Sequence, residues 1–130
     1  MLTPLPQKYK DAERWSFGDN EAQADDLAKK VIAGVKTATC ANLDDDGIPE
    51  VGEVFVVVDG KNHPVCAVKL TQVKQVPFDL VTEDHAYAEG EGDRTLASWR
   101  VELQRFFEAY DMFSPDMPLL LMKFELVETF

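Results

Sequence analysis

A run of six residues from Glu53 to Val58 constrains the fold more than any other part of the sequence. Five of the six are valine or phenylalanine, so both faces of an extended strand would be apolar. A strand of this kind must be covered on both faces. The polar turn Asp59–Asn62 and a second apolar segment from Val65 to Leu70 follow. This order predicts a β-hairpin whose first strand is buried.

The segment before this hairpin carries the spacing of an amphipathic helix. Trp15 and Phe17 predict a short packed strand or turn that closes onto the helix, which Asp19 or Asn20 can cap. Gly34 stands where a left-handed C-cap belongs. The apolar residues recur at i, i+3, i+4, i+7 and i+8, which predicts one buried stripe; they are Ala24, Leu27, Ala28, Val31 and Ile32.

Strand patterns flank a second helical region. A threonine-rich strand from Val35 is expected to end in the acidic turn Asp44–Gly47, and a bulge is expected near Thr71 and Gln72 in the strand after the hairpin. Short helical turns then precede a longer helix and a closing strand at Leu119–Val127. That helix should bury a largely aromatic face made of Leu96, Trp99, Leu103, Phe106, Phe107 and Tyr110.

This order of elements predicts one domain over residues 1–130. It contains no βαβ repeat and no glycine-rich dinucleotide turn, so the expected class is α+β, with a small mixed or antiparallel β-barrel and flanking helices. No apolar run approaches the ~20 residues that span a bilayer, and the first residues lack the apolar core of a signal peptide. A cytoplasmic protein without a membrane partner is therefore expected. Cys40 and Cys66 have no zinc-site or disulfide spacing and are predicted to be small buried hydrophobes.

The formal net charge of −11 bears on the partner. A nucleic-acid binder usually presents a basic face and gains affinity from phosphate neutralisation, whereas the cationic residues here are scattered. The charge therefore disfavours RNA as a partner and favours a small, neutral or weakly charged substrate.

The stretch from Asp84 to Trp99 is the one that packing explains least. It joins a histidine, several carboxylates, two glycines and Arg94 between two apolar segments. Glycine is favoured where the chain takes positive φ or approaches another group closely, so a functional loop is expected here, although a solvated connector would also explain the acids. Its acids disfavour a phosphate cradle, and their order does not match a hard-metal loop. No metal and no cofactor are predicted.

Lys36 and Thr39 lie between the first helix and the threonine-rich strand. A lysine beside a buried strand can serve as a base for a neighbouring hydroxyl. In an ideal strand these two side chains face opposite sides, so both reach one pocket only if the strand starts near Thr37. Otherwise they are a solvated lysine and a β-favouring threonine.

The segments GVKTATC and HAYAEGEGDRTLASW, with the final apolar strand, resemble the small stand-alone ASCH domain family from about Trp15 to Val127. The resemblance implies a PUA-like β-barrel. The family includes an amidohydrolase that deacylates N4-acetylcytidine with a lysine, a threonine and a glutamate, which match Lys36, Thr39 and Glu89. Other members are described as ribonucleases or RNA binders. The wider family places an arginine where this chain has Ala41.

These observations lead to a functional hypothesis: a metal-independent amidohydrolase that cleaves the exocyclic amide of N4-acylated cytidine or a similar small nucleoside. Thr39 would attack, neutral Lys36 would take its proton, and Glu89 would return a proton to the leaving group. The expected substrate-binding residues are Arg94, Tyr87, Trp15 and His85, with Arg94 replacing the missing arginine. The alternatives are a ribonuclease or RNA-binding module, and a regulatory domain that binds a small nucleotide without turnover.

Overall fold

The structure is a computed structural model, and it describes residues 5–18, 20–43 and 48–130. Its strands are β1 (Glu13–Trp15), β2 (Ala38–Asn42), β3 (Val54–Val58), β4 (Pro64–Pro77) and β5 (Pro118–Thr129). Its α-helices are α1 (Glu21–Ile32), α2 (Glu83–Glu89) and α3 (Leu96–Ala109), and two short 3-10 helices are η1 (Gln7–Tyr9) and η2 (Phe78–Leu80). The predicted acidic turn at 44–47 lies outside the described residues.

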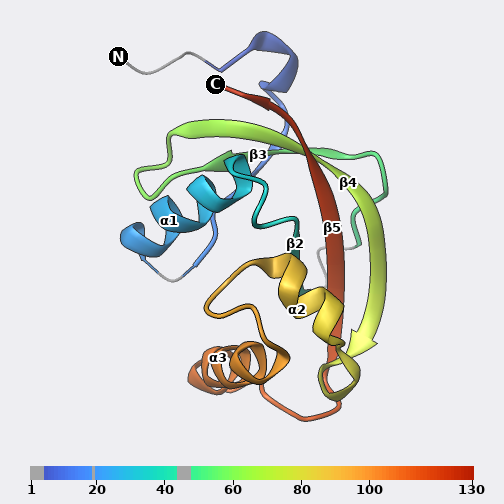
Figure 1. The fold of residues 1–130 in the computed structure, drawn as a ribbon. Helices are drawn as coiled ribbons and strands as arrows, with labels where there is room; N and C mark the ends of the chain where they lie inside the picture. Colours follow the sequence, from blue (N-terminus) through green and yellow to red (C-terminus); the bar gives the residue numbers. More distant parts are fainter. Residues whose placement is uncertain (1–4, 19, 44–47) are drawn as a thin grey trace.

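The five strands form one curled sheet, a half-barrel in which the long strands β4 and β5 bend across the whole molecule (Figure 1). The strand order is β1-β3-β4-β5-β2. β1 runs parallel to β3, and the other neighbours are antiparallel. The α+β class with a small mixed sheet is therefore confirmed. Within the described part of the chain, no helix has the length and apolar character needed to cross a membrane.

β3 is buried on both faces, as its sequence predicts. Phe55 and Val57 belong to the core that α1 covers, whereas Val56 and Val58 pack on the other face with Tyr9. The pairing of β4 with β5 shifts between Leu70 and Gln72, which confirms the predicted bulge.

The α1 helix begins and ends at the predicted signals. The Asn20 side chain accepts a hydrogen bond from the backbone N–H of Gln23. At the other end Gly34 has φ +79°, and the N–H of Val35 donates to the carbonyl of Lys30, an arrangement of the Schellman type. The stripe is buried except at its last member, Ile32, which is exposed because the helix ends there and turns toward β2.

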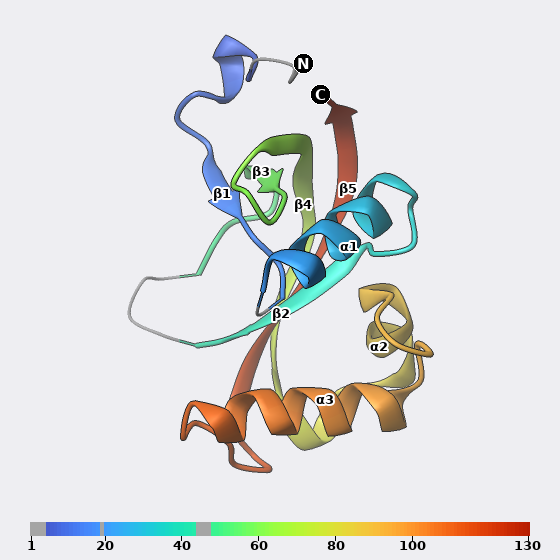
Figure 2. The ribbon, with the colours of Figure 1, turned by 90° about the vertical axis from the view of Figure 1, so that its left-hand side faces the viewer.

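A second core lies where α2 and α3 pack against the ends of β4 and β5 (Figure 2). Thr95 caps α3, and Trp99 and Phe107 are buried on its inner face. The predicted aromatic face is too wide, since Phe106 and Tyr110 are exposed and their rings contact each other at a tilt. Both lie on the side of the helix that faces away from the second core.

Candidate functional site

The candidate site forms where the end of α2 meets the segment between α1 and β2. The backbone N–H of Thr37 donates to the carbonyl of Ala88 at 2.7 Å. Gly90, with φ +71°, ends α2, and a Cβ added there would lie 2.6 Å from the carbonyl oxygen of Val35. Only glycine lets the two segments approach this closely. This contact confirms the sequence argument for a close approach in the glycine-rich stretch.

Lys36 lies at the centre of this contact, and its side chain is fully buried. Its Nζ donates to the carbonyl oxygens of Ala38 at 3.0 Å and Glu89 at 3.2 Å, and to Oε2 of Glu91 at 2.8 Å. The ring of Phe17 lies 5.0 Å from Nζ, within the range of a cation–π interaction. The alternative of a solvated lysine is therefore wrong.

The carboxylate of Glu89 is held near Lys36 by two further side chains. Its Oε2 lies 2.6 Å from Nε2 of His85 and accepts the indole N–H of Trp99 at 2.8 Å. Its Oε1 lies 3.9 Å from Nζ of Lys36. Burial by itself raises the pKa of this carboxyl, but the hydrogen bond from His85 and the charge of Lys36 outweigh burial, so the pKa lies below its usual value of 4.5. Glu89 is therefore a buried carboxylate.

Cys40, on β2, adjoins the same carboxylate. The residue is half-buried, and its side chain packs toward the second core. Burial, with a further contribution from the negative charge of Glu89, raises the pKa of the Cys40 thiol well above its usual value. A protonated thiol is a poor nucleophile. We therefore assign Cys40 a packing role in the wall of the site. Cys66 is buried, and both thiols are free.

Thr39 occupies the second position of β2, opposite Met122 of β5. The strand starts at Ala38, so Lys36 precedes it, as the shared-pocket hypothesis requires. Thr39 is half-buried. Within the described part of the chain its hydroxyl makes no hydrogen bond to Lys36 or Glu89. Its role as nucleophile stays a prediction.

Arg94 is tied to the backbone of the site. Its Nε donates to the carbonyl of Tyr87 at 3.0 Å and its Nη2 to the carbonyl of Val35 at 3.3 Å. Its guanidinium carbon lies 3.5 Å from the centre of the exposed Tyr87 ring. In this arrangement Arg94 clamps the residue before Lys36 to α2, and its substrate-binding role stays a prediction.

Trp15 is half-buried, and His85 is buried. Trp15 stacks on Phe55 with ring centroids 4.1 Å apart and contributes to the core under α1. His85 is buried, and its Nε2 is engaged with Glu89. Each can contact a substrate only at the edge that its packing leaves accessible.

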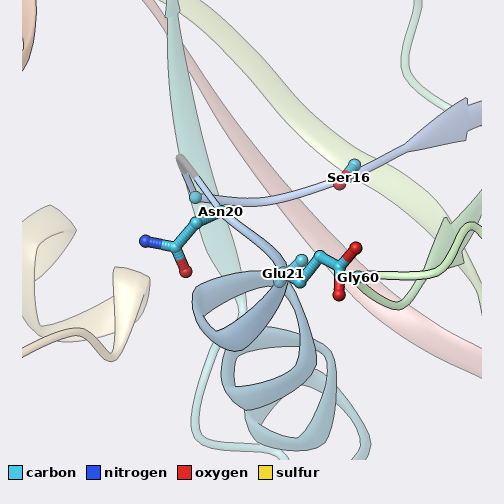
Figure 3. A pocket seen from close by; sticks show the side chains of 6 residues that line it. Ser16, Asn20, Glu21 and Gly60 are labelled. Carbon is cyan, nitrogen blue, oxygen red and sulfur yellow. The ribbon is translucent and has the colours of Figure 1, made fainter.

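Neither of two hollows in the protein surface is lined by Lys36, Thr39 or Glu89. One, of about 170 Å³, lies between Ser16, the start of α1 and Gly60 (Figure 3). The other, of about 250 Å³, lies between α2 and strands β4 and β5 and includes His85, Lys74 and Lys123. Among the described residues, no three His, Cys, Asp or Glu side chains are grouped so that they could hold a metal ion.

Glu91 and Trp99 contribute contacts that sequence reasoning did not assign. Trp99 was expected only as a core residue, and its place in the core is correct, yet its indole N–H also holds Glu89. Glu91 looked like one acid among several. The sequence feature that could have indicated its role is its position between two glycines. Gly90 and Gly92 both adopt positive φ and turn the chain so that Glu91 reaches Lys36.

A family model of the ASCH domain matches residues 13–128. The structure is similar to an ASCH domain from Lactobacillus crispatus JV V101, with a TM-score of 0.83 and 31% identity over 92% of this chain and 82% of that chain. It is similar to a protein from Enterococcus faecalis V583, with a TM-score of 0.81 and 33% identity over the same shares of the two chains.

A mutant ASCH protein from Zymomonas mobilis has a TM-score of 0.54 and 11% identity over 92% of this chain and 73% of that chain, a likeness of fold alone. No curated protein sequence matches this chain.

Proposed function

The chain belongs to the ASCH domain family, and from that premise we propose that it is a hydrolase of the exocyclic amide of N4-acylated cytidine or a similar small nucleoside. The observation that carries the proposal is the buried pair of Lys36 and Glu89. Burying two ionised groups costs several kcal/mol each, and well-packed apolar residues would often stabilise a fold as well or better. A pair retained in such a place, inside a network of further titratable groups, is a candidate for acid–base chemistry.

In the proposed reaction, Thr39 Oγ1 attacks the acyl carbon, and its proton passes to Lys36 Nζ in the neutral amine form. The bond between the acyl carbon and N4 then breaks, and N4 leaves as the amine of cytidine after it receives a proton from the Lys36 and Glu89 pair. Water attacks the acyl-threonine ester, and the same pair takes a proton from the water and returns it to Thr39 Oγ1 as the ester bond breaks, which releases a carboxylic acid and restores the enzyme. The net change is addition of one water across the amide bond.

Three features support a small substrate. The net charge of −11 repels long polyanions at low salt. A ribonuclease or RNA-binding module was expected to use Lys36 and Arg94 as a local basic spot. Here Lys36 is buried, so it is not presented to a phosphate backbone, and Arg94 uses two of its five donors on backbone carbonyls. The exposed ring of Tyr87 beside Arg94 offers a flat surface on which a single base can stack.

The test is incubation of the purified protein with a panel of N4-acylated cytidines, and separately with single-stranded RNA. Release of cytidine from the wild-type protein and its loss in Lys36→Ala are expected. Lys69→Ala is the matched control, because Lys69 is an exposed lysine of β4 outside the site. Cleavage of RNA without cytidine release would instead favour the ribonuclease reading.

A further inference from the structure

We propose that Glu91 is a positioning residue that holds Lys36 as a charged ammonium in the substrate-free protein and must release it before the lysine can act as a base. The holding role is argued from contacts alone. The consequence of release for catalysis rests on the proposed function.

The hydrogen bonds of Lys36 are those of an ammonium. A lysine ammonium has three N–H donors and no acceptor, and Nζ has three oxygen acceptors: two backbone carbonyls and Oε2 of Glu91. A neutral amine has only two donors, so one of these oxygens would face its lone pair. The shortest of the three contacts, 2.8 Å, is to Glu91. This arrangement leaves Nζ no free position from which to accept the proton of a threonine.

The other groups around Nζ are fixed in place by packing or by further hydrogen bonds, so they cannot move away from the lysine. Glu89 approaches to 3.9 Å, and its carboxylate is fixed by His85 and Trp99. The Phe17 ring belongs to the core under α1. Cys40 lies behind Glu89 with its thiol protonated, since burial and the charge of Glu89 raise its pKa. Two carboxylates lie near Nζ, those of Glu89 and Glu91. Among the described residues, no side chain other than Lys36 holds the carboxylate of Glu91.

The position of Glu91 in the chain suits release. Its side chain is 43% exposed, whereas that of Glu89 is 4% exposed. Glu91 follows Gly90, which anchors the end of α2 against Val35, and precedes Gly92 with φ +60°. The Glu91 side chain can therefore rotate into solvent while α2 and Glu89 stay in place.

Release also has a defined proton balance. As substrate excludes water, the N–H bond at Nζ breaks and an O–H bond forms at Oε2 of Glu91. The ion pair thus becomes a neutral pair, which costs less in a desolvated site. Glu91 then swings out with the proton and gives it to solvent. Lys36 is left as a neutral amine that faces the substrate.

The experiment measures how fast the Lys36 amine is acetylated by an N-hydroxysuccinimide ester of acetic acid at one fixed pH, with quantitation by mass spectrometry. Only a neutral amine reacts. Glu91→Gln keeps the size and an acceptor oxygen but removes the charge, so we expect acetylation of Lys36 to rise about tenfold, equivalent to about 1.4 kcal/mol and at the lower end for hydrogen bonds to charged groups. Acetylation of Lys69 in the same sample is the internal control.

Two further variants distinguish the charge of Glu91 from steric shielding of Lys36 Nζ by its side chain. Asp84→Asn removes an exposed carboxylate of α2 that makes no ion pair with any described residue, and it should leave acetylation of Lys36 unchanged. Glu91→Ala removes both the charge and the side chain that shields Nζ from the reagent. If Glu91→Ala accelerates acetylation and Glu91→Gln does not, Glu91 only shields the amine, and the inference is overturned.

Activity gives an independent readout. On N4-acylated cytidine, Glu91→Gln should move the acidic limb of the pH–rate profile to lower pH, because Lys36 then lacks the anion that stabilises its ammonium form and can give its proton directly to water. If cytidine is released but neither acetylation nor this limb changes, the inference fails and the hydrolase stands. If acetylation rises while no variant releases cytidine, the holding role stands and the hydrolase fails.

Discussion

Glu89 meets Lys36 twice: its backbone carbonyl oxygen accepts a hydrogen bond from Nζ at 3.2 Å, and its carboxylate Oε1 lies 3.9 Å from the same nitrogen. The first contact depends on where α2 ends, and the second depends on how His85 and Trp99 orient the side chain. Backbone geometry and side-chain chemistry therefore both position the lysine, and substitutions can test the two separately.

The backbone contribution predicts a difference between two glycine substitutions. Gly34→Ala and Gly90→Ala both place alanine at positive φ, with strain of about 1–2 kcal/mol. At Gly34 the added Cβ meets nothing within 4 Å, whereas at Gly90 it would lie 2.6 Å from the Val35 carbonyl oxygen. Urea unfolding should show the larger loss of stability for Gly90→Ala. Equal losses would mean that the approach of α2 to Lys36 is not tight.

The side-chain contribution predicts a cost for Trp99→Phe beyond the loss of ring area. The indole N–H of Trp99 donates to the Glu89 carboxylate inside the protein, and a hydrogen bond to a charged group contributes about 1.5–3 kcal/mol. Trp15→Phe is the matched control, since Trp15 packs in the core by stacking on Phe55. The free energy of unfolding should fall further for Trp99→Phe. A larger fall for Trp15→Phe would show that packing, not the hydrogen bond, dominates.

Local sequence patterns predict part of the fold and little of the candidate site. The cap at Asn20, the turn at Gly34 and the shift near Gln72 are local events, and local residue types predict them. Exposure of Phe106 was missed because helical spacing defines one face of a helix but not how much of it a neighbouring element covers.

The contacts of Lys36 could not be predicted from local sequence patterns. Its pairing with Glu89 joins residues 53 positions apart, and it was expected from family resemblance, not from spacing. The contact with Glu91 was missed because the same acid in a solvated loop would give an identical pattern. Only the approach of α2 to the segment before β2 distinguishes the two.

The lowered pKa of Glu89 predicts how stability depends on pH. A carboxyl whose pKa is lower in the folded chain stabilises the fold above its unfolded pKa, and this contribution is lost as pH falls through the folded value. Between about pH 5 and the lowered pKa of Glu89, the wild-type protein should lose more free energy of unfolding than Glu89→Gln. Exposed acids titrate in both proteins and cancel in the difference. Parallel pH curves would mean that Glu89 is not stabilised as a carboxylate.

Salt dependence tests the substrate class. Binding of single-stranded RNA releases counterions, so its affinity should fall with a slope of about −0.7 per contacted phosphate, whereas a neutral nucleoside releases almost none. With a net charge of −11, turnover of small cytidine derivatives should change little between low and moderate salt, and any RNA binding should be weak throughout. Tight, salt-sensitive RNA binding would favour the RNA-binding reading.

The rate of cytidine release from N4-acetylcytidine by Lys36→Arg, compared with wild type, tests the central claim most directly. An arginine keeps the positive charge near Glu89 and Glu91, but a guanidinium stays protonated and cannot accept the proton of Thr39. The account predicts release by the wild-type protein and none by the folded Lys36→Arg variant. Near wild-type release by Lys36→Arg would contradict it, because the lysine would then act only as a fixed charge.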